Sequence, residues 1–219
     1  MSEQTKIRSP QQSRSIDKKE RLISSAYALF CELGFYKTTT PEIAKRAGLS
    51  IGCLYSYFKD KHDLFLTVLD RYYERFGEIR ADALRDLNDQ DLPLRDSFRS
   101  LLLKLVDIHR ESSALNIEAR ILAYSDPAVR ERQKAQRAVV REAVLASMRA
   151  NASRMRVTDI EAATEVIDDL FSGIVHRIAF GESEVDDERM LEAALDAACA
   201  YLLLPDSPDG EPRRPPIPT

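Results

Sequence analysis

Residues 39–58 read TTPEIAKRAGLSIGCLYSYF, and this stretch decides the fold. Thr39 and Glu42 form a capping box with a proline between them in the first turn, so a helix starts here. Gly48 ends that helix almost at once, and Ser50 caps a second short helix that ends near residue 58. Two short helices joined by so tight a connection predict a helix-turn-helix, whose second helix enters the major groove of DNA.

The front of the second helix is suited to close contact with DNA. Its leading residues, all uncharged, are Ser50, Ile51, Gly52 and Cys53. Gly52 permits close approach of the backbone, in a groove about 12 Å wide that accepts a single helix. Side chains suited to phosphate oxygens surround this front, namely Lys45, Arg46, Tyr55, Tyr57, Lys59 and Lys61. Small helical bundles that do not bind DNA also contain short helices with glycine turns, but the spacing, charge and small leading residues together favour DNA binding.

A longer run around this segment, from Gly34 to Leu64, reads GFYKTTTPEIAKRAGLSIGCLYSYFKDKHDL and resembles the TetR family of bacterial transcriptional regulators. The family pattern has a G-[FY]-x-x-T-[TS] entry, I-A-x-x-A-G-V-S-x-G in the turn, and then L-Y-x-[HY]-F-x-x-K-x-x-L. Leu49 replaces the commoner valine, and Cys53 stands where threonine, alanine or serine is more usual. The match covers roughly residues 18–70, about a quarter of the chain.

The resemblance implies a DNA-facing role for each matching polar residue. Thr39 would bind a phosphate from the N-terminus of its helix, and residues 50–53 would face bases or nearby phosphates. The DNA backbone would be held by Tyr55, Tyr57 and Lys61, although an aromatic side chain such as Tyr57 can also simply be packed.

Other residues of the segment allow two interpretations. Lys45 and Arg46 fit a DNA contact and a solvated helix face equally well. Cys53 lies at a helix N-terminus, which could support redox sensing, but its place on the DNA-facing surface favours a base or phosphate contact. Leu54 and Phe58 are better interpreted as core residues.

Charge is unevenly distributed along the chain. Residues 1–63 contain 11 basic and 7 acidic residues, whereas the remainder contains 21 basic and 29 acidic ones. This asymmetry indicates that only the N-terminal part contacts a polyanion. Residues 1–16 are polar and predict a flexible basic arm, which either reaches a minor groove through Lys6, Arg8 and Arg14 or stays solvated.

Composition and motifs argue for an all-α protein and against an enzyme. Seven glycines and little β-branched alternation disfavour a sheet, and three widely spaced cysteines form neither a disulfide framework nor a metal motif. His62, His109 and His176 have no neighbour at metal-ligand spacing. The sequence contains no glycine-rich phosphate loop and no nucleophile elbow, so no cofactor, metal or catalytic residue is expected. Without a membrane-length apolar run or a signal-peptide core, we expect a cytoplasmic, bacterial location.

Periodicity and punctuation divide the chain into four parts. We expect a flexible arm over 1–16, a helix-turn-helix domain over 17–77, a larger helical domain over 78–204 and a proline-rich tail over 205–219. Within the larger domain, helices are expected near 94–110, 114–124, 128–150, 158–180 and 187–204. The family resemblance implies that this domain binds a small-molecule effector and forms a homodimer.

Two apolar stripes in the last two helices favour the homodimer. Their members are Ile160, Ala163, Ile167, Leu170 and Ile174 in one helix, and Leu191, Ala194, Leu195, Ala198 and Leu202 in the other. The core of a single chain could absorb the same stripes. The helix-turn-helix favours the dimer, because two half-sites of a palindromic operator require two heads related by a two-fold axis.

Candidate pocket residues are less distinctive. Residues that combine apolar and polar character on the inward faces of the helices are Phe98, Leu102, Leu105, His109, Ile121, Tyr124, Phe171 and His176. Residues of these types are more often plain core, and the acidic balance of the domain disfavours a strongly anionic effector. The resulting hypothesis is a ligand-responsive transcriptional repressor that binds double-stranded operator DNA. The alternative is a DNA-associated structural or cell-division protein of the same fold that needs no effector.

Overall fold

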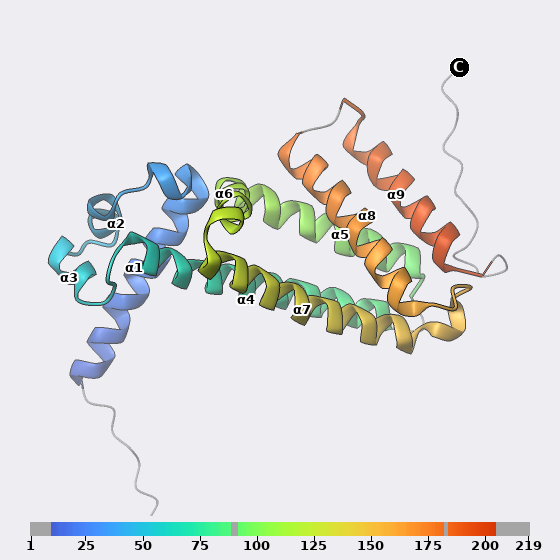
Figure 1. The fold of residues 1–219 in the computed structure, drawn as a ribbon, viewed down its shortest axis with the longest axis horizontal. Coiled ribbons are helices and arrows are strands. Elements are labelled where there is room, and N and C mark those ends of the chain that lie inside the picture. Colours follow the sequence, from blue (N-terminus) through green and yellow to red (C-terminus); the bar gives the residue numbers. More distant parts are fainter. Residues whose placement is uncertain (1–9, 89–91, 182–183, 205–219) are drawn as a thin grey trace, which may run out of the picture. The chain divides into compact units, whose positions relative to one another are not determined.

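The computed structural model describes residues 10–88, 92–181 and 184–204, and these residues are almost entirely helical (Figure 1). The helices are α1 (Pro10–Lys37), α2 (Thr40–Arg46), α3 (Ile51–Tyr55), α4 (Lys61–Asn88), α5 (Leu94–Glu111), α6 (Ser113–Ser125), α7 (Pro127–Ala150), the short 3₁₀ helix η1 (Ala152–Arg154), α8 (Ile160–Phe180) and α9 (Asp187–Leu202). In the described ranges the only β-pairing is an isolated antiparallel bridge between Met155 and Leu203. The expected all-α class is confirmed.

The helices form two compact units that do not follow the order of the chain. The first consists of Met1–Tyr72 and Ala114–Arg130, and the second of Tyr73–Ser113 and Glu131–Thr219. The expected boundary after residue 77 lies close to Tyr72, where the chain first passes from the first unit to the second. Helix α6 was expected in the larger domain, but it packs with the first unit instead. Its buried Asn116 amide donates to the Tyr72 hydroxyl at 2.7 Å, an attachment that helical periodicity alone cannot reveal.

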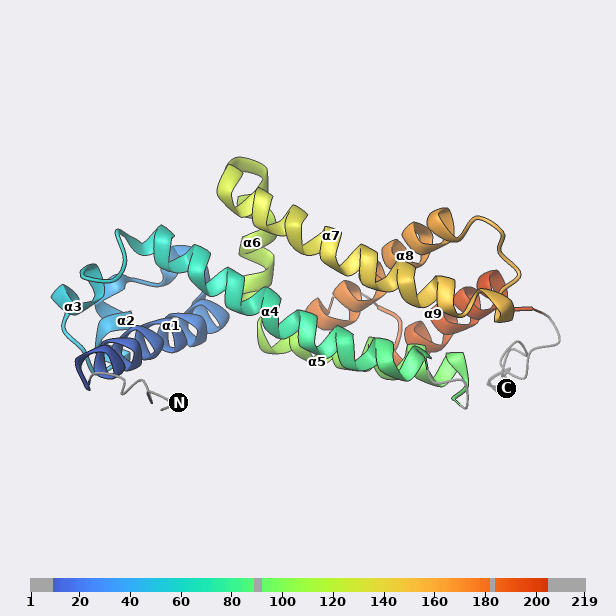
Figure 2. The same cartoon turned by 90° about the horizontal axis from the view of Figure 1, so that it is seen from below.

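An aromatic and aliphatic core holds the first unit together. The rings of Phe30 and Phe65 meet edge to face with centroids 5.3 Å apart, and Phe35 lies 4.7 Å from Phe65. Leu54 of α3 and Phe58, both expected in the core, are buried. Figures 1 and 2 show α2 and α3 side by side next to α1, so this core fixes the orientation of the helix-turn-helix.

Helix α1 starts earlier than expected. It begins at Pro10, so residues 10–16, expected in a flexible arm, are helical. A proline fits the first turn because it has no N–H to leave unpaired and its φ is already helical. The Ser15 hydroxyl lies 3.0 Å from the Tyr57 hydroxyl, which ties this first part of α1 to the end of the helix-turn-helix. The remaining arm, residues 1–9, and the tail, residues 205–219, lie outside the described residues.

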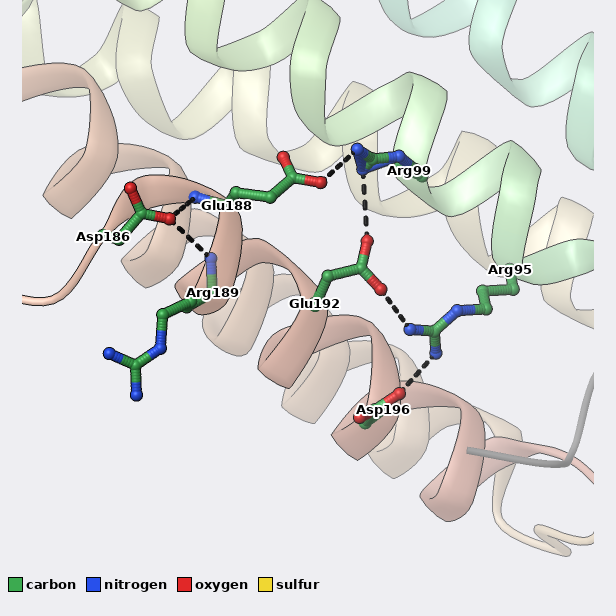
Figure 3. A network of polar contacts seen from close by, with 7 residues as sticks. All are labelled: Arg95, Arg99, Asp186, Glu188, Arg189, Glu192 and Asp196. Carbon is green, nitrogen blue, oxygen red and sulfur yellow. Dashed lines mark hydrogen bonds and ion pairs between the residues drawn. The ribbon is translucent and has the colours of Figure 1, made fainter. Parts of the chain in front are cut away.

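In the second unit, α5 packs against α8 and α9, and α8 packs against α9. Arginine–carboxylate pairs join α5 to α9 (Figure 3). Arg95 contacts Glu192 at 2.5 Å and Asp196 at 2.6 Å, while Arg99 contacts Glu188 and also Glu192. The Arg95 side chain is almost fully buried, so its two carboxylates offset the cost of removing a guanidinium from water.

Most of the stripe predicted as a dimer interface is buried within the single chain. The buried members are Ala163, Ile167, Leu191, Ala194, Leu195, Ala198 and Leu202, whereas Ile160, Leu170 and Ile174 are half-buried. The seven buried residues pack inside the second unit, as the alternative of a single-chain core allowed. Amphipathic periodicity shows that a helix face is covered, but not whether the same chain or a second one covers it.

Candidate nucleic-acid interface

The capping signals predicted from the sequence are confirmed atom by atom. The Thr39 hydroxyl accepts from the Glu42 N–H at 3.4 Å, and the Glu42 carboxylate accepts from the Thr39 N–H at 2.9 Å. Hydrogen bonds from the Thr39 side chain and backbone hold the pKa of Glu42 below its ordinary value. Ser50 caps α3 by accepting from the Cys53 N–H at 3.2 Å. The helix-turn-helix is therefore organised by its own side chains.

A side chain of α1 stabilises the turn between α2 and α3 by a hydrogen bond. Gly48 has a left-handed φ of +65°, a conformation that glycine adopts without steric cost. The Arg21 guanidinium donates to the Ala47 carbonyl at 2.6 Å, and a Cβ at position 48 would lie 2.9 Å from the same guanidinium. Position 48 therefore favours glycine for its backbone conformation, and a larger residue there would also displace the end of the Arg21 side chain from the turn.

The front of α3 is accessible. Among its leading residues, Ser50, Ile51 and Gly52 are exposed and Cys53 is half-buried. The exposed Tyr55 hydroxyl lies 3.1 Å from the Thr40 hydroxyl, so the two hydroxyls form a polar edge between α2 and α3. Such an edge presents hydroxyl and small side chains of the kind that bind phosphates and base edges.

Two neighbouring basic residues on α2, for which the sequence allowed the same two interpretations, differ in their ion pairing. Arg46 forms a bidentate ion pair with Glu32 of α1 at 2.7 and 2.8 Å. The hydrogen bonds of this pair raise the pKa of Arg46 and lower that of Glu32. Lys45 is exposed and, within the described part of the chain, has no ion-pair partner. Lys45 is thus the available cation of the two.

Lys61 is turned toward the protein. Its ammonium donates to the carbonyls of Phe35 and Thr38 at 2.8 and 2.9 Å and lies 4.3 Å from the centre of the Phe35 ring. Burial lowers the pKa of Lys61, and the negative charge of Glu118 partly offsets this. Two of its three N–H donors are used inside the first unit, which leaves one for a phosphate. A structural role for this lysine was not apparent from the sequence.

Two further candidates were missed by the sequence reasoning. Thr40 shares the polar edge with Tyr55, and Lys37 is exposed in the last turn of α1 without an ion-pair partner among the described residues. Both belong to the run Lys37-Thr38-Thr39-Thr40, which leads into α2, so their proximity to the capping box was the available signal.

Comparison with known proteins identifies this segment. Residues 22–68 match the model of bacterial regulatory proteins of the tetR family. They form a TetR-family domain. The TetR match coincides with the part of the first unit that carries α2 and α3.

Curated relatives match mostly over this TetR domain. The transcriptional regulator HbdR of Aromatoleum sp. (strain CIB) is 48% identical over 60 residues, which are 26% of this chain and 26% of HbdR. The match thus spans about a quarter of HbdR. The transcriptional repressor AcnR of Corynebacterium diphtheriae is 25% identical over 178 residues, covering 80% of this chain and 88% of AcnR.

Solved structures share the fold over most of the chain. A TetR-family regulator from Mesorhizobium loti superimposes with a TM-score of 0.72 at 20% identity, covering 87% of this chain and 99% of its own. SmeT, the repressor of the Stenotrophomonas maltophilia efflux pump SmeDEF, has a TM-score of 0.65 at 22% identity, covering 93% and 99%. These likenesses establish a TetR-type fold with an N-terminal helix-turn-helix domain and a helical C-terminal domain. None of the helices in the described ranges is long and apolar enough to cross a membrane.

A cavity lies within the second unit, between α4, α5, α7 and α8. Its space not filled by protein atoms is about 620 Å³, open solvent at its mouth included. The lining residues are Arg80, Leu84, Leu94, Phe98, Leu101, Leu105, Val144, Ser147, Met148, Asn151, Met155, Ile167, Asp168, Phe171 and Ser172. Three of the eight predicted pocket residues, Phe98, Leu105 and Phe171, line it.

The other five predicted pocket residues lie elsewhere. Leu102 is fully buried core, and the rings of His109 and His176 meet edge to face with centroids 5.0 Å apart in an aromatic cluster. Ile121 and Tyr124 are 57% and 89% exposed on α6, within the first unit. Their expected inward orientation is wrong, because α6 buries its opposite face.

Proposed function

We propose that this protein is a DNA-binding transcriptional regulator of the TetR type that acts as a homodimer and whose DNA affinity is changed by a small molecule. One observation carries the proposal: the exposed, uncharged front of α3 belongs to a helix-turn-helix within the TetR-family match. Base contacts would come from residues 50–53 at this front. Phosphate contacts would come from Thr39, Lys45, Tyr55, Tyr57 and Lys61, and we propose Lys37 and Thr40 as further phosphate contacts. A target on the chromosome implies a cytoplasmic site of action.

Outward-facing apolar residues on α8 and α9 support the homodimer. Beyond the buried stripes, α8 exposes Val166 and Gly173 and half-exposes Leu170 and Ile174. Helix α9 exposes a second row at helical spacing, formed by Ala193, Ala197, Ala200 and Tyr201. Small and apolar side chains in such rows let helices of two chains approach closely. We propose as the dimer interface these outward rows, which keep Leu170 and Ile174 of the predicted stripe and exclude its buried members.

The cavity in the second unit is the proposed effector site. A ligand that binds better to the state with low DNA affinity must weaken DNA binding, and DNA must weaken ligand binding by the same factor. Coupling of about 1–3 kcal/mol, or 5- to 150-fold, is typical. The regulators AcnR and SmeT are both named repressors, and we propose repression released by the ligand for this chain as well.

Selection from randomised duplexes tests the DNA-binding function. We expect the wild-type protein to enrich a palindrome with two half-sites about one DNA turn apart. The Cys53→Ala variant should change the preferred base at one position of each half-site and leave the salt dependence of binding unaltered, since no charge is removed. Enrichment of no sequence would contradict the proposal. Sequence-dependent binding at many dispersed sites, unaffected by any cavity ligand, would support the effector-independent alternative.

A further inference from the structure

The cavity of the second unit contains an incompletely paired cation. The Arg80 side chain is 20% exposed, and its Nη1 atom lies 3.5 Å from Oδ1 of Asp168. Its buried Nε atom has no hydrogen-bond partner. Arg95, a buried arginine of the same unit, shows the contrast: two carboxylates contact it at 2.5 and 2.6 Å (Figure 3). Arg80 therefore retains donor capacity that Arg95 has already used.

The surroundings of Arg80 make this incomplete pairing costly. Most of the cavity wall is apolar, including Leu84, Phe98 and Phe171. Burial lowers the pKa of Arg80, and the charge of Asp168 offsets this only in part. A buried guanidinium with unmet donors destabilises a protein, so a partner that restores those hydrogen bonds would bind favourably.

We infer that the cavity binds a molecule with one carboxylate and an apolar body, with the carboxylate on Arg80 and the body against the leucine, phenylalanine and methionine wall. A guanidinium presents paired N–H donors that match a carboxylate, and the apolar wall suits a hydrocarbon or aromatic group. This inference names the chemical class of the proposed effector, and it rests on the proposed function because only that proposal makes the ligand of this cavity an effector.

The charge distribution favours this ligand class over a cation. Asp168 is the acidic residue of the wall, and its side chain is 48% exposed. A cation at Asp168 would lie close to the less exposed Arg80 and be repelled by it. A single carboxylate also agrees with the acidic balance of the domain, which disfavours only strongly anionic ligands.

Calorimetric titration of the full chain with matched ligands tests the inference. The probes are hexanoate, decanoate and tetradecanoate, the primary alcohols of the same lengths, and decyltrimethylammonium. We expect at least one carboxylate to bind 10-fold or more tightly than its alcohol. Arg80→Gln should remove most of that preference while leaving alcohol binding nearly unchanged, and Arg80→Lys should keep part of it. If no carboxylate exceeds its alcohol, or if decyltrimethylammonium binds most tightly, the inference is wrong.

Thermal unfolding separates binding from folding in these variants. Arg80→Met should leave the Tm unchanged or raise it, because it removes an incompletely paired buried charge. Arg95→Gln is the matched control: it should lower the Tm, since it leaves Glu192 and Asp196 without their partner, and preserve the carboxylate preference. A lower Tm for Arg80→Met together with an intact carboxylate preference would mean that Arg80 is structural, and would overturn the inference.

A DNA-binding assay with the same probes distinguishes the inference from the proposed function. Preferred carboxylate binding without any change in DNA affinity would leave the ligand site standing and contradict its role as an effector site. Intact DNA binding without any carboxylate preference would leave the proposed DNA-binding function standing and contradict the inferred carboxylate site.

Discussion

The carboxylate of Glu118 on α6 accepts a hydrogen bond from the backbone N–H of Phe35, directly after Gly34. The same oxygen accepts from the Tyr36 N–H at 3.2 Å. Gly34 interrupts α1 with φ 81° and ψ 174°, a conformation nearly confined to glycine. A segment more than eighty residues away in the chain thus provides the acceptor for the N–H groups that this interruption leaves unpaired.

Replacing Glu118 by alanine should lower the free energy of unfolding by about 1–3 kcal/mol, because the partly buried N–H of Phe35 and the exposed N–H of Tyr36 lose their acceptor. Urea unfolding followed by circular dichroism measures the change. Glu142→Ala, on an exposed position of α7, is the control and should change stability by less than about 0.5 kcal/mol. Equal effects of the two substitutions would contradict the capping role of Glu118.

Gly34→Ala should also destabilise the protein, by about 1–3 kcal/mol for the backbone conformation, with a steric part added. A Cβ at position 34 would lie 2.4 Å from the Glu118 carboxylate, so this carboxylate must shift. In the double variant with Glu118→Ala the steric part disappears, and the two losses should sum to more than the loss measured for the pair. Strict additivity would show that the two positions do not interact.

The two basic residues of α2 should differ in DNA binding. Lys45→Ala should weaken all duplexes alike and flatten the slope of log affinity against log salt by about one per protomer, since one phosphate contact is lost. Arg46→Ala should change that slope much less, because the Arg46 guanidinium is occupied by Glu32. Fluorescence anisotropy at several salt concentrations provides the measurement. If Arg46→Ala flattened the slope more than Lys45→Ala, the side of α2 that carries Arg46 would face DNA, and this prediction would be wrong.

Lys61→Ala should reduce both stability and DNA affinity. Loss of its two hydrogen bonds to the carbonyls of Phe35 and Thr38 should cost about 1–3 kcal/mol of unfolding free energy. If the third donor binds a phosphate, the salt slope should fall by about one per protomer as well. Thermal denaturation and anisotropy on the same preparation separate the two effects. An unchanged slope with a lower Tm would assign Lys61 a structural role alone.

The charge of Asp126 should stabilise the first unit in a pH-dependent way. Burial raises the pKa of Asp126, but hydrogen bonds from His62 at 2.5 Å and from the N–H groups of Val129 and Ala128 outweigh it, so this pKa lies below its ordinary value. A lowered folded-state pKa contributes stability above the unfolded-state pKa of about 3.9, and this contribution is lost as the pH falls through the folded-state value. Asp126→Asn should therefore cost about 0.3–1 kcal/mol at pH 5.5, and the cost should shrink toward pH 3. A cost that grows on acidification would contradict this.

The outward row of α8 should hold the dimer together. Leu170→Glu would place an unpaired charge in the proposed interface and should shift the protein toward monomer, at a cost of several kcal/mol. Sedimentation velocity at micromolar concentration measures the oligomeric state. Glu165→Gln, on an exposed position of the same helix, is the control and should remain dimeric. A wild-type monomer would contradict the proposed interface.

The features that were correctly predicted from sequence are local ones. The Thr39–Glu42 capping box and the Ser50 cap depend on residues three positions apart, and both form as expected. The limits of α6 and α8 agree with their expected ranges to within two residues, because proline, glycine and capping signals act on adjacent backbone.

The features that were missed depend on distant parts of the chain. Lys45 and Arg46 are equivalent in sequence and differ only because Glu32 of α1 reaches one of them. The apolar stripes of α8 and α9 were assigned to a dimer interface because the sequence does not show that α5 of the same chain packs against both helices. Ile121 and Tyr124 were assigned to a pocket from composition, although which face of α6 is buried follows from its packing with the first unit.

Because α6 completes the first unit, the unit that contains the helix-turn-helix is not a modular N-terminal segment. A fragment that ends at Tyr72 would lack the acceptor for the Phe35 and Tyr36 N–H groups and the Asn116 partner of the Tyr72 hydroxyl. Grafting this head onto the body of another regulator would therefore require transplanting residues 114–130 as well. In this protein, an exchange of the first unit must move two separate stretches of sequence together.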